Sequence, residues 1–170
     1  PAWAWAKPPV WVVRDADSTI VLFGSVHILP KDLDWRPQAL TDAMTQADDI
    51  WFEAPLDDAS RLEASRVALQ LSFLPKGESL SKLLSRKDAA RLKRVAQDLN
   101  VPLKELDALQ PWYAEIVLAL GQISRYGGRR DDGVERVIDR EAPPTAERRA
   151  FETAGGQISL YAGVPRSAQL

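Results

Sequence analysis

The sequence predicts an α/β protein, with a mixed β-sheet that begins in an N-terminal hairpin and is flanked by a mostly helical middle region. Three features predict this class: two strand-like runs joined by turn residues, a short buried-looking strand after the first helix, and several apolar helical stripes in the middle of the chain. Hydrophobic residues make up 45% of the chain and charged residues 27%, a balance typical of globular proteins rather than disordered ones.

The N-terminal segment is expected to consist of an extended lead-in and a β-hairpin. Residues 1–9 contain a proline pair, which disfavours helix at and before it. Residues 10–14 and 19–23 are rich in β-branched and aromatic side chains, and the Asp-Ala-Asp-Ser stretch at 15–18 has the chemistry of a turn. The two runs are therefore predicted to pair as a hairpin.

A helix and a further strand are expected next. Residues 40–47 carry apolar side chains at the i, i+3, i+4, i+7 spacing of one helical face, and residues 50–52 form a short strand that ends at Glu53. If this strand and the one at 19–23 are parallel neighbours, their carboxyl ends meet at one edge of the sheet. Open α/β sheets bind their ligands at such edges.

The remainder of the chain is predicted to be mainly helical. Strands thus cluster in the first third, and the pattern lacks the further strands that a closed α/β sheet needs. We therefore expect residues 1–170 to be a single domain that lacks its C-terminal part. They would then be the N-terminal part of a longer protein. The later elements expected are helices over about 62–73, 86–99 (capped by Ser85), 112–123 and 134–138, a strand at 149–152 and a short helix capped by Thr153.

Composition excludes several classes of function. The net charge is −2, so the chain lacks the basic excess that nucleic-acid binding requires. It contains no cysteine, which excludes disulfides and thiolate metal sites. Its apolar runs are shorter than the ~18 residues of a membrane span, so membrane association is expected only through a segment upstream of Pro1.

The tryptophans are expected to serve mainly in packing. Trp11, Trp51 and Trp112 occupy core-like positions of the predicted strands and helix. Trp3 and Trp5 lie in the lead-in, where they either pack onto the sheet or form an exposed patch for a partner or membrane.

The candidate site centres on His27, the single histidine of the chain. It ends a Gly24-Ser25-Val26-His27 turn after a strand, where glycine permits a sharp turn or a close approach to a ligand. An imidazole there binds a metal or acts as a base near neutral pH. Glu53 follows the next strand, and the two side chains share a cation or pair as base and orienting acid if the strands are neighbours. The alternative is that both are ordinary hydrogen-bonded surface residues.

Ser25 is a weaker candidate for chemistry. It lies on a tight turn two residues from His27, but the Gly-x-Ser-x-Gly elbow of serine hydrolases is missing. Gly24 and Ser25 are therefore interpreted as motif and backbone residues of the site.

The segment Thr19 to Pro30, which contains this turn, resembles the opening motif of the TraB/GumN family, which includes the Tiki-type proteases. The similarity continues in the same order along nearly the whole chain. It includes Trp51-Phe52-Glu53, Leu80 to Leu84, Pro111-Trp112-Tyr113-Ala114, Gly133-Val134-Glu135 and Phe151-Glu152-Thr153 with Gln157.

The resemblance implies a periplasmic, secreted or cell-envelope protein with a fold related to erythromycin esterases and ChaN-like haem proteins. Tiki-type members are metal-dependent peptidases with two Gly-x-x-His motifs and a glutamate. By motif position, His27 and Glu53 are the implied catalytic residues, and His27, Glu53 and Glu152 the implied ligands of a divalent Mn, Co or Zn ion. The implied activity is hydrolysis of a peptide or ester bond.

One departure from the family limits this expectation. The chain has a single histidine, so the second Gly-x-x-His motif is missing from it. A catalytic centre normally has three protein ligands, so we expect residues 1–170 alone to be inactive. Self-association that joins two His27 side chains is one alternative. Another is a non-catalytic envelope protein that binds haem or a small molecule, because one histidine suffices as an axial haem ligand.

Overall fold

The computed structural model describes residues 7–170 and confirms the predicted α/β class, with about 51% helix and 15% strand. Residues 1–6 of the predicted lead-in, with Trp3 and Trp5, lie outside the described residues. The chain forms two compact units. The first contains the described residues up to Phe52 together with Gly127–Arg149, and the second contains Glu53–Tyr126 and Ala150–Leu170.

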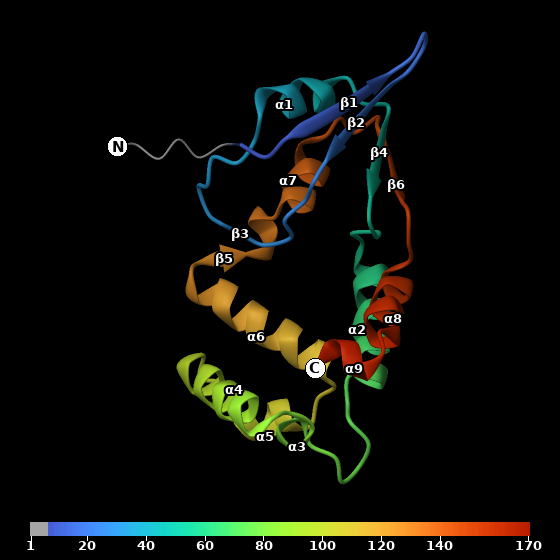
Figure 1. The fold of residues 1–170 in the computed structure, drawn as a ribbon. Helices are drawn as coiled ribbons and strands as arrows, with labels where there is room; N and C mark the ends of the chain where they lie inside the picture. Colours follow the sequence, from blue (N-terminus) through green and yellow to red (C-terminus); the bar gives the residue numbers. More distant parts are fainter. Residues whose placement is uncertain (1–6) are drawn as a thin grey trace, which may run out of the picture. The chain divides into compact units, whose positions relative to one another are not determined.

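The predicted hairpin is confirmed in the first unit. Strand β1 (Val10–Arg14) pairs antiparallel with β2 (Thr19–Phe23), and Val10 lies opposite Phe23 (Figure 1). Asp15 closes the turn, because its Oδ1 accepts hydrogen bonds from the backbone N–H of Asp17 (3.2 Å) and Ser18 (2.7 Å). This is the local side-chain bonding for which aspartate is favoured in turns.

Two of the three tryptophan predictions are wrong. Trp11 pairs with Leu22 across the hairpin, and both side chains are about half exposed, because β1 and β2 form a two-stranded sheet by themselves. Trp51 is also about half exposed, and the Arg149 guanidinium lies 5.6 Å from its ring centroid. Trp112, in contrast, is buried as predicted.

The strands of the described residues fall into three two-stranded sheets. The other two sheets pair β3 (Leu29–Pro30) antiparallel with β5 (Gly128–Arg129), and β4 (Asp49–Phe52) with β6 (Glu147–Ala150). The condition that the strands around 19–23 and 50–52 are parallel neighbours is therefore not met, because each has a different partner.

The β4–β6 pair is the parallel one. Its flanking hydrogen bonds join Glu147 N–H to Asp48 O (2.7 Å) and Glu152 N–H to Glu53 O (3.0 Å). Residue numbers increase together along the two strands, so the strands run in the same direction. Glu53 and Glu152 consequently follow the carboxyl ends of neighbouring parallel strands.

Helices cover the rest of the first unit. They are α1 (Gln38–Thr45), the 3-10 turn η1 (Arg130–Asp132) and α7 (Val134–Glu141). Helices α1 and α7 contribute buried apolar residues to this unit, as do β3 and β4. The buried apolar residues include Leu29, Leu40, Met44, Phe52, Val134 and Val137.

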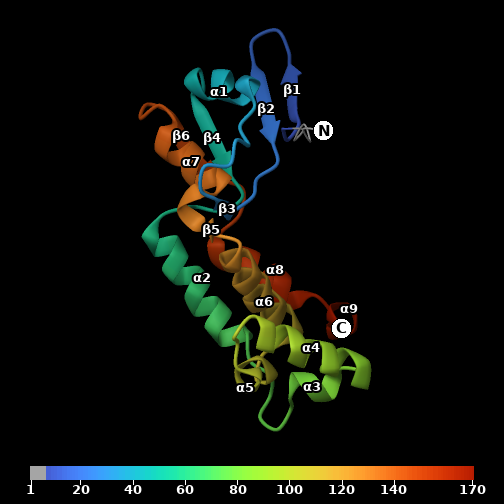
Figure 2. The same ribbon diagram turned by 90° about the vertical axis from the view of Figure 1, so that its left-hand side faces the viewer.

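The second unit is helical, as predicted for the middle of the chain. Asp57 and Ser85 cap the first turns of α2 and α4, and Thr153 caps α8. Helices α2 and α8 pack along one another (Figure 2). The helices are α2 (Asp58–Leu71), α3 (Leu80–Leu83), α4 (Arg86–Asp98), α5 (Leu103–Asp107), α6 (Pro111–Arg125), α8 (Ala154–Gly163) and α9 (Arg166–Gln169).

The core of this unit lies among α3 to α6. Leu106 of α5 is completely buried at its centre. Its buried neighbours in the cluster are Leu74, Leu80, Leu92, Ala96, Leu109 and Ala114. Across residues 7–170, none of the helices has the length and apolarity needed to cross a membrane.

Candidate functional site

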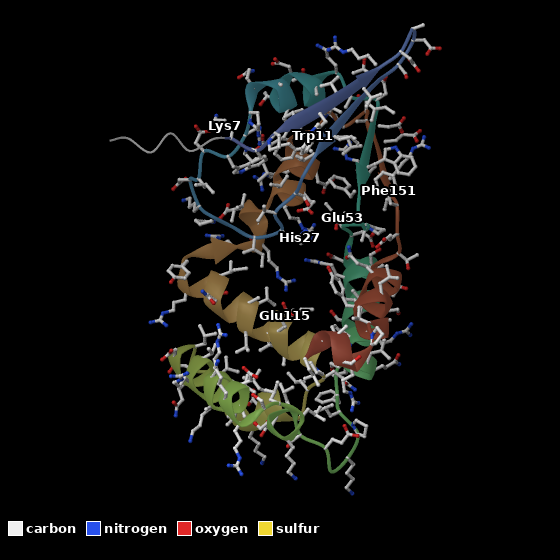
Figure 3. The ribbon with its side chains drawn as sticks, in the orientation of Figure 1. Lys7, Trp11, His27, Glu53, Glu115 and Phe151 are labelled. Atoms are coloured by element: carbon white, nitrogen blue, oxygen red, sulfur yellow. The ribbon has the colours of Figure 1, made fainter. Side chains whose placement is uncertain are left out.

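His27 lies in the loop between β2 and β3 of the first unit (Figure 3). The loop begins at Gly24, directly after β2, and reaches β3 two residues beyond His27. The imidazole is 66% exposed to solvent. A side chain of this type at a strand end is available to a ligand or substrate while its loop is anchored by the strand.

Glu135, in the first turn of α7, contacts His27. Glu135 Oε1 lies 2.6 Å from His27 Nδ1 and accepts a 2.5 Å hydrogen bond from Ser25 Oγ. Glu135 is only 8% exposed, which is rare for a carboxylate without partners. The location also suits a negative charge, because the amino-terminal end of a helix carries partial positive charge.

The backbone fixes this contact. Val134 N–H donates to Val26 O at 2.9 Å, which ties the His27 loop to the start of α7. Gly133 Cα packs so closely on the loop that an added Cβ would lie 2.0 Å from His27 O. Its φ of −64° is open to any residue, so the glycine is required by space and not by conformation.

Opposing effects act on the acidity of Glu135. Burial raises the pKa of its carboxyl group, but hydrogen bonds from His27, from Ser25 and from the backbone, together with the charge of His27, lower it by more, so the net pKa lies below the usual value. The group is therefore an anion at neutral pH, and both neighbours act as donors to it.

The Gly-Ser-Val-His turn thus contains residues with separate roles. Ser25 Oγ donates a hydrogen bond to Glu135. At Gly24, an added Cβ would meet no atom within 4 Å, and its φ lies outside the left-handed region. The close backbone approach to this loop occurs at Gly133.

The two predicted carboxylate residues lie in the second unit. Gln157 Nε2 of α8 donates to Glu53 Oε2 at 3.2 Å, and Glu152 N–H donates to Glu53 O. Both glutamates are exposed. The parallel pairing of β4 and β6 brings their backbones together, so the expected convergence of strand ends occurs between Glu53 and Glu152.

Comparison with known proteins defines the family. The model of the TraB/PrgY/gumN family matches residues 9–170. The chain belongs to this family. Searches of curated proteins and of solved structures gave no match to it.

In this TraB/PrgY/gumN protein the candidate residues can be compared with the ligand set of a metal site. Within residues 7–170, no group of three or more His, Asp or Glu side chains is placed to hold a metal ion. His27 by itself suits one ligand position, because metal-binding histidines commonly donate their other ring N–H to a carboxylate. His27 and Glu53 belong to different units, so their joint action stays a prediction.

Glu135 is the residue of this TraB/PrgY/gumN site that the sequence did not identify. It is separated by 110 residues from Ser25, and nothing in its helical pattern names a partner. The available signal was the Gly133-Val134-Glu135 stretch, which the family resemblance included without a role for the glutamate. A glycine at a helix start followed by an acid is consistent with close backbone packing and a helix-end carboxylate.

Proposed function

We propose that this TraB/PrgY/gumN protein is a metal-dependent hydrolase of peptide or ester bonds, with His27 as the imidazole of its site. The observation that supports it most is the contact between His27 Nδ1 and the buried Glu135. An exposed imidazole backed by a carboxylate occurs both in metal-binding histidines and in general bases.

The residues of the proposed site have different roles. Glu135 orients the ring, and His27 offers its other ring nitrogen as a ligand or as the base for water. Glu53 and Glu152 are the further carboxylate donors that the family resemblance predicts, and Gln157 restrains Glu53. A bound Mn, Co or Zn ion supplies polarisation of the scissile carbonyl. The described residues do not complete its coordination.

The test uses the natural full-length protein, a chromogenic ester, a fluorogenic peptide pool and added Mn, Co or Zn. We expect metal-dependent hydrolysis that falls at least ~100-fold in His27→Ala, the usual contribution of a positioned acid–base group. Glu53→Gln and Glu152→Gln are expected to weaken metal binding in calorimetry. Glu115→Gln, which changes an exposed glutamate of α6, is the matched control.

Two results would contradict the proposal. One is full-length protein that binds none of the three metals and hydrolyses neither substrate. The other is hydrolysis that is unchanged in His27→Ala. A Soret shift on haem titration that disappears in His27→Ala would favour the haem-binding alternative over hydrolysis.

A further inference from the structure

The acceptor character of Glu135 determines where the proton of its contact with His27 lies. A glutamate is ordinarily ionised at neutral pH, and an ionised carboxylate only accepts hydrogen bonds. Oε1 of Glu135 lies 2.6 Å from His27 Nδ1 and 2.5 Å from Ser25 Oγ. Both groups must therefore donate to it. A neutral His27 then carries its proton on Nδ1, and its basic lone pair is on Nε2.

The surroundings of Glu135 hold this arrangement rigid. The two donors stand two residues apart on one loop and converge on one buried oxygen. Between them, Val26 O accepts from Val134 N–H, one residue before Glu135 in the chain. Gly133 packs against the His27 carbonyl, which leaves no room for the loop to approach the helix more closely. Loop and helix start are thus joined through both backbone and side chains.

We propose that Glu135 is a positioning residue that selects the Nδ1–H tautomer of His27, and that Ser25 is the second donor that keeps the carboxylate in place. Ser25 thus acts through Glu135 and not as a nucleophile. The meaning of this tautomer for catalysis rests on the proposed function, because it makes Nε2 the nitrogen that meets water, substrate or a metal ion. The tautomer itself is a property of the chain and is measurable without activity.

The single histidine makes the test direct. With ¹⁵N-labelled histidine, the chain gives one pair of ring nitrogen signals. The spectrum is recorded at the alkaline plateau of a pH series, where the ring nitrogen signals no longer change with pH, so that a neutral ring is observed. We expect the Nδ1–H form to predominate, the reverse of the Nε2–H preference of free histidine. A predominant Nε2–H form in the wild-type chain overturns the proposal.

Three variants separate positioning from general disruption. Glu135→Leu removes the acceptor, and we expect the Nε2–H form to become the major one. Glu135→Gln keeps a neutral oxygen acceptor in the same space, and we expect a mixture of the two forms. Ser25→Ala leaves the carboxylate and should keep Nδ1–H dominant. If Glu135→Leu retains the wild-type circular dichroism but shows no change of tautomer, the proposal is also overturned.

A second measurement links the tautomer to the proposed function and separates the two failures. In the full-length protein, loss of such a carboxylate partner typically reduces metal affinity or activity about 10–100-fold. A confirmed tautomer in a protein without hydrolysis rejects the proposed function and retains the positioning role. Hydrolysis that depends on His27, in a protein whose ring is in the Nε2–H form, retains the proposed function and rejects the positioning role.

Discussion

Two glycines of the candidate site, Gly24 and Gly133, have different steric surroundings. A Cβ at Gly133 would overlap the His27 carbonyl, whereas one at Gly24 would meet open space. Both have backbone angles that an alanine can adopt. The difference between them therefore isolates the effect of close packing on the His27 loop.

Alanine substitution of these glycines gives the first prediction. Gly133→Ala is expected to lower the free energy of unfolding by about 1–3 kcal/mol, because the added methyl forces backbone against backbone. Gly24→Ala, the control, should stay within about 0.5 kcal/mol of wild type. Urea unfolding followed by circular dichroism measures both. Equal effects of the two substitutions would contradict the assigned close approach.

The candidate site was predictable from sequence only where its residues are local. Gly24, Ser25 and His27 form one short motif after a recognisable strand, so His27 could be selected from the sequence alone. Glu135 could not, because its partnership depends on how α7 folds back onto the loop, at a sequence separation of 110 residues from Ser25. Residue types and spacing carry no information about such a contact until the fold is known.

At the scale of elements, the core of α3 to α6 contains the most deeply buried leucine of the described chain. Leu106 is 0% exposed within its cluster, whereas Leu62 on α2 is 72% exposed. The two leucines have the same side chain in very different surroundings. They therefore form a matched pair for measuring what burial contributes.

The second prediction uses this pair. Leu106→Ala removes buried methyl groups and leaves a cavity, so the free energy of unfolding should fall by about 2–5 kcal/mol. Leu62→Ala should change it by less than about 0.5 kcal/mol, because the side chain is largely in solvent already. Denaturant unfolding of both variants checks this. A loss of stability in Leu62→Ala as large as that in Leu106→Ala would contradict the difference in burial between the two leucines.

Elements themselves were largely predictable, and their partners were not. The hairpin strands β1 and β2 match the expected residues, and the caps at Ser85 and Thr153 are observed, because turn and cap chemistry are local. The partner of β4 could not be identified from the sequence, since β4 pairs with β6, about a hundred residues later in the chain. The exposure of Trp11 could not be predicted for the same reason, because burial depends on which layer covers a strand.

At the scale of the whole molecule, carboxylates with lowered pKa values occur in both units. The side chain of Ser18 lowers the pKa of Asp15, the backbone of Ser60 lowers that of Asp57, and Arg36 lowers that of Glu141. Glu135 joins them, with hydrogen bonds that outweigh its burial. Each of these groups favours the folded state as an anion, so acid opposes folding at several places at once.

The third prediction is a loss of stability on acidification. A carboxyl group whose pKa is lowered on folding stabilises the protein above its unfolded pKa, and the contribution is lost as the pH falls through the folded pKa. The unfolded reference values are 3.8 for aspartate and 4.5 for glutamate. The urea midpoint should therefore decrease steadily from about pH 6 to about pH 3. A constant or rising midpoint over this range would contradict the pKa directions.

The Arg36–Glu141 pair provides the sharpest version of this test. Arg36 Nη1 lies 2.6 Å from Glu141 Oε2, and this hydrogen bond is the main cause of the lowered pKa of Glu141. Glu141→Gln and Arg36→Gln should each flatten the pH dependence by a similar amount, because either change removes the proton-linked contact. Arg36 also lies 5.3 Å from the Trp35 ring centroid. Loss of that contact shifts the midpoint at every pH but leaves the slope unchanged, so the slope and not the midpoint reports the ion pair.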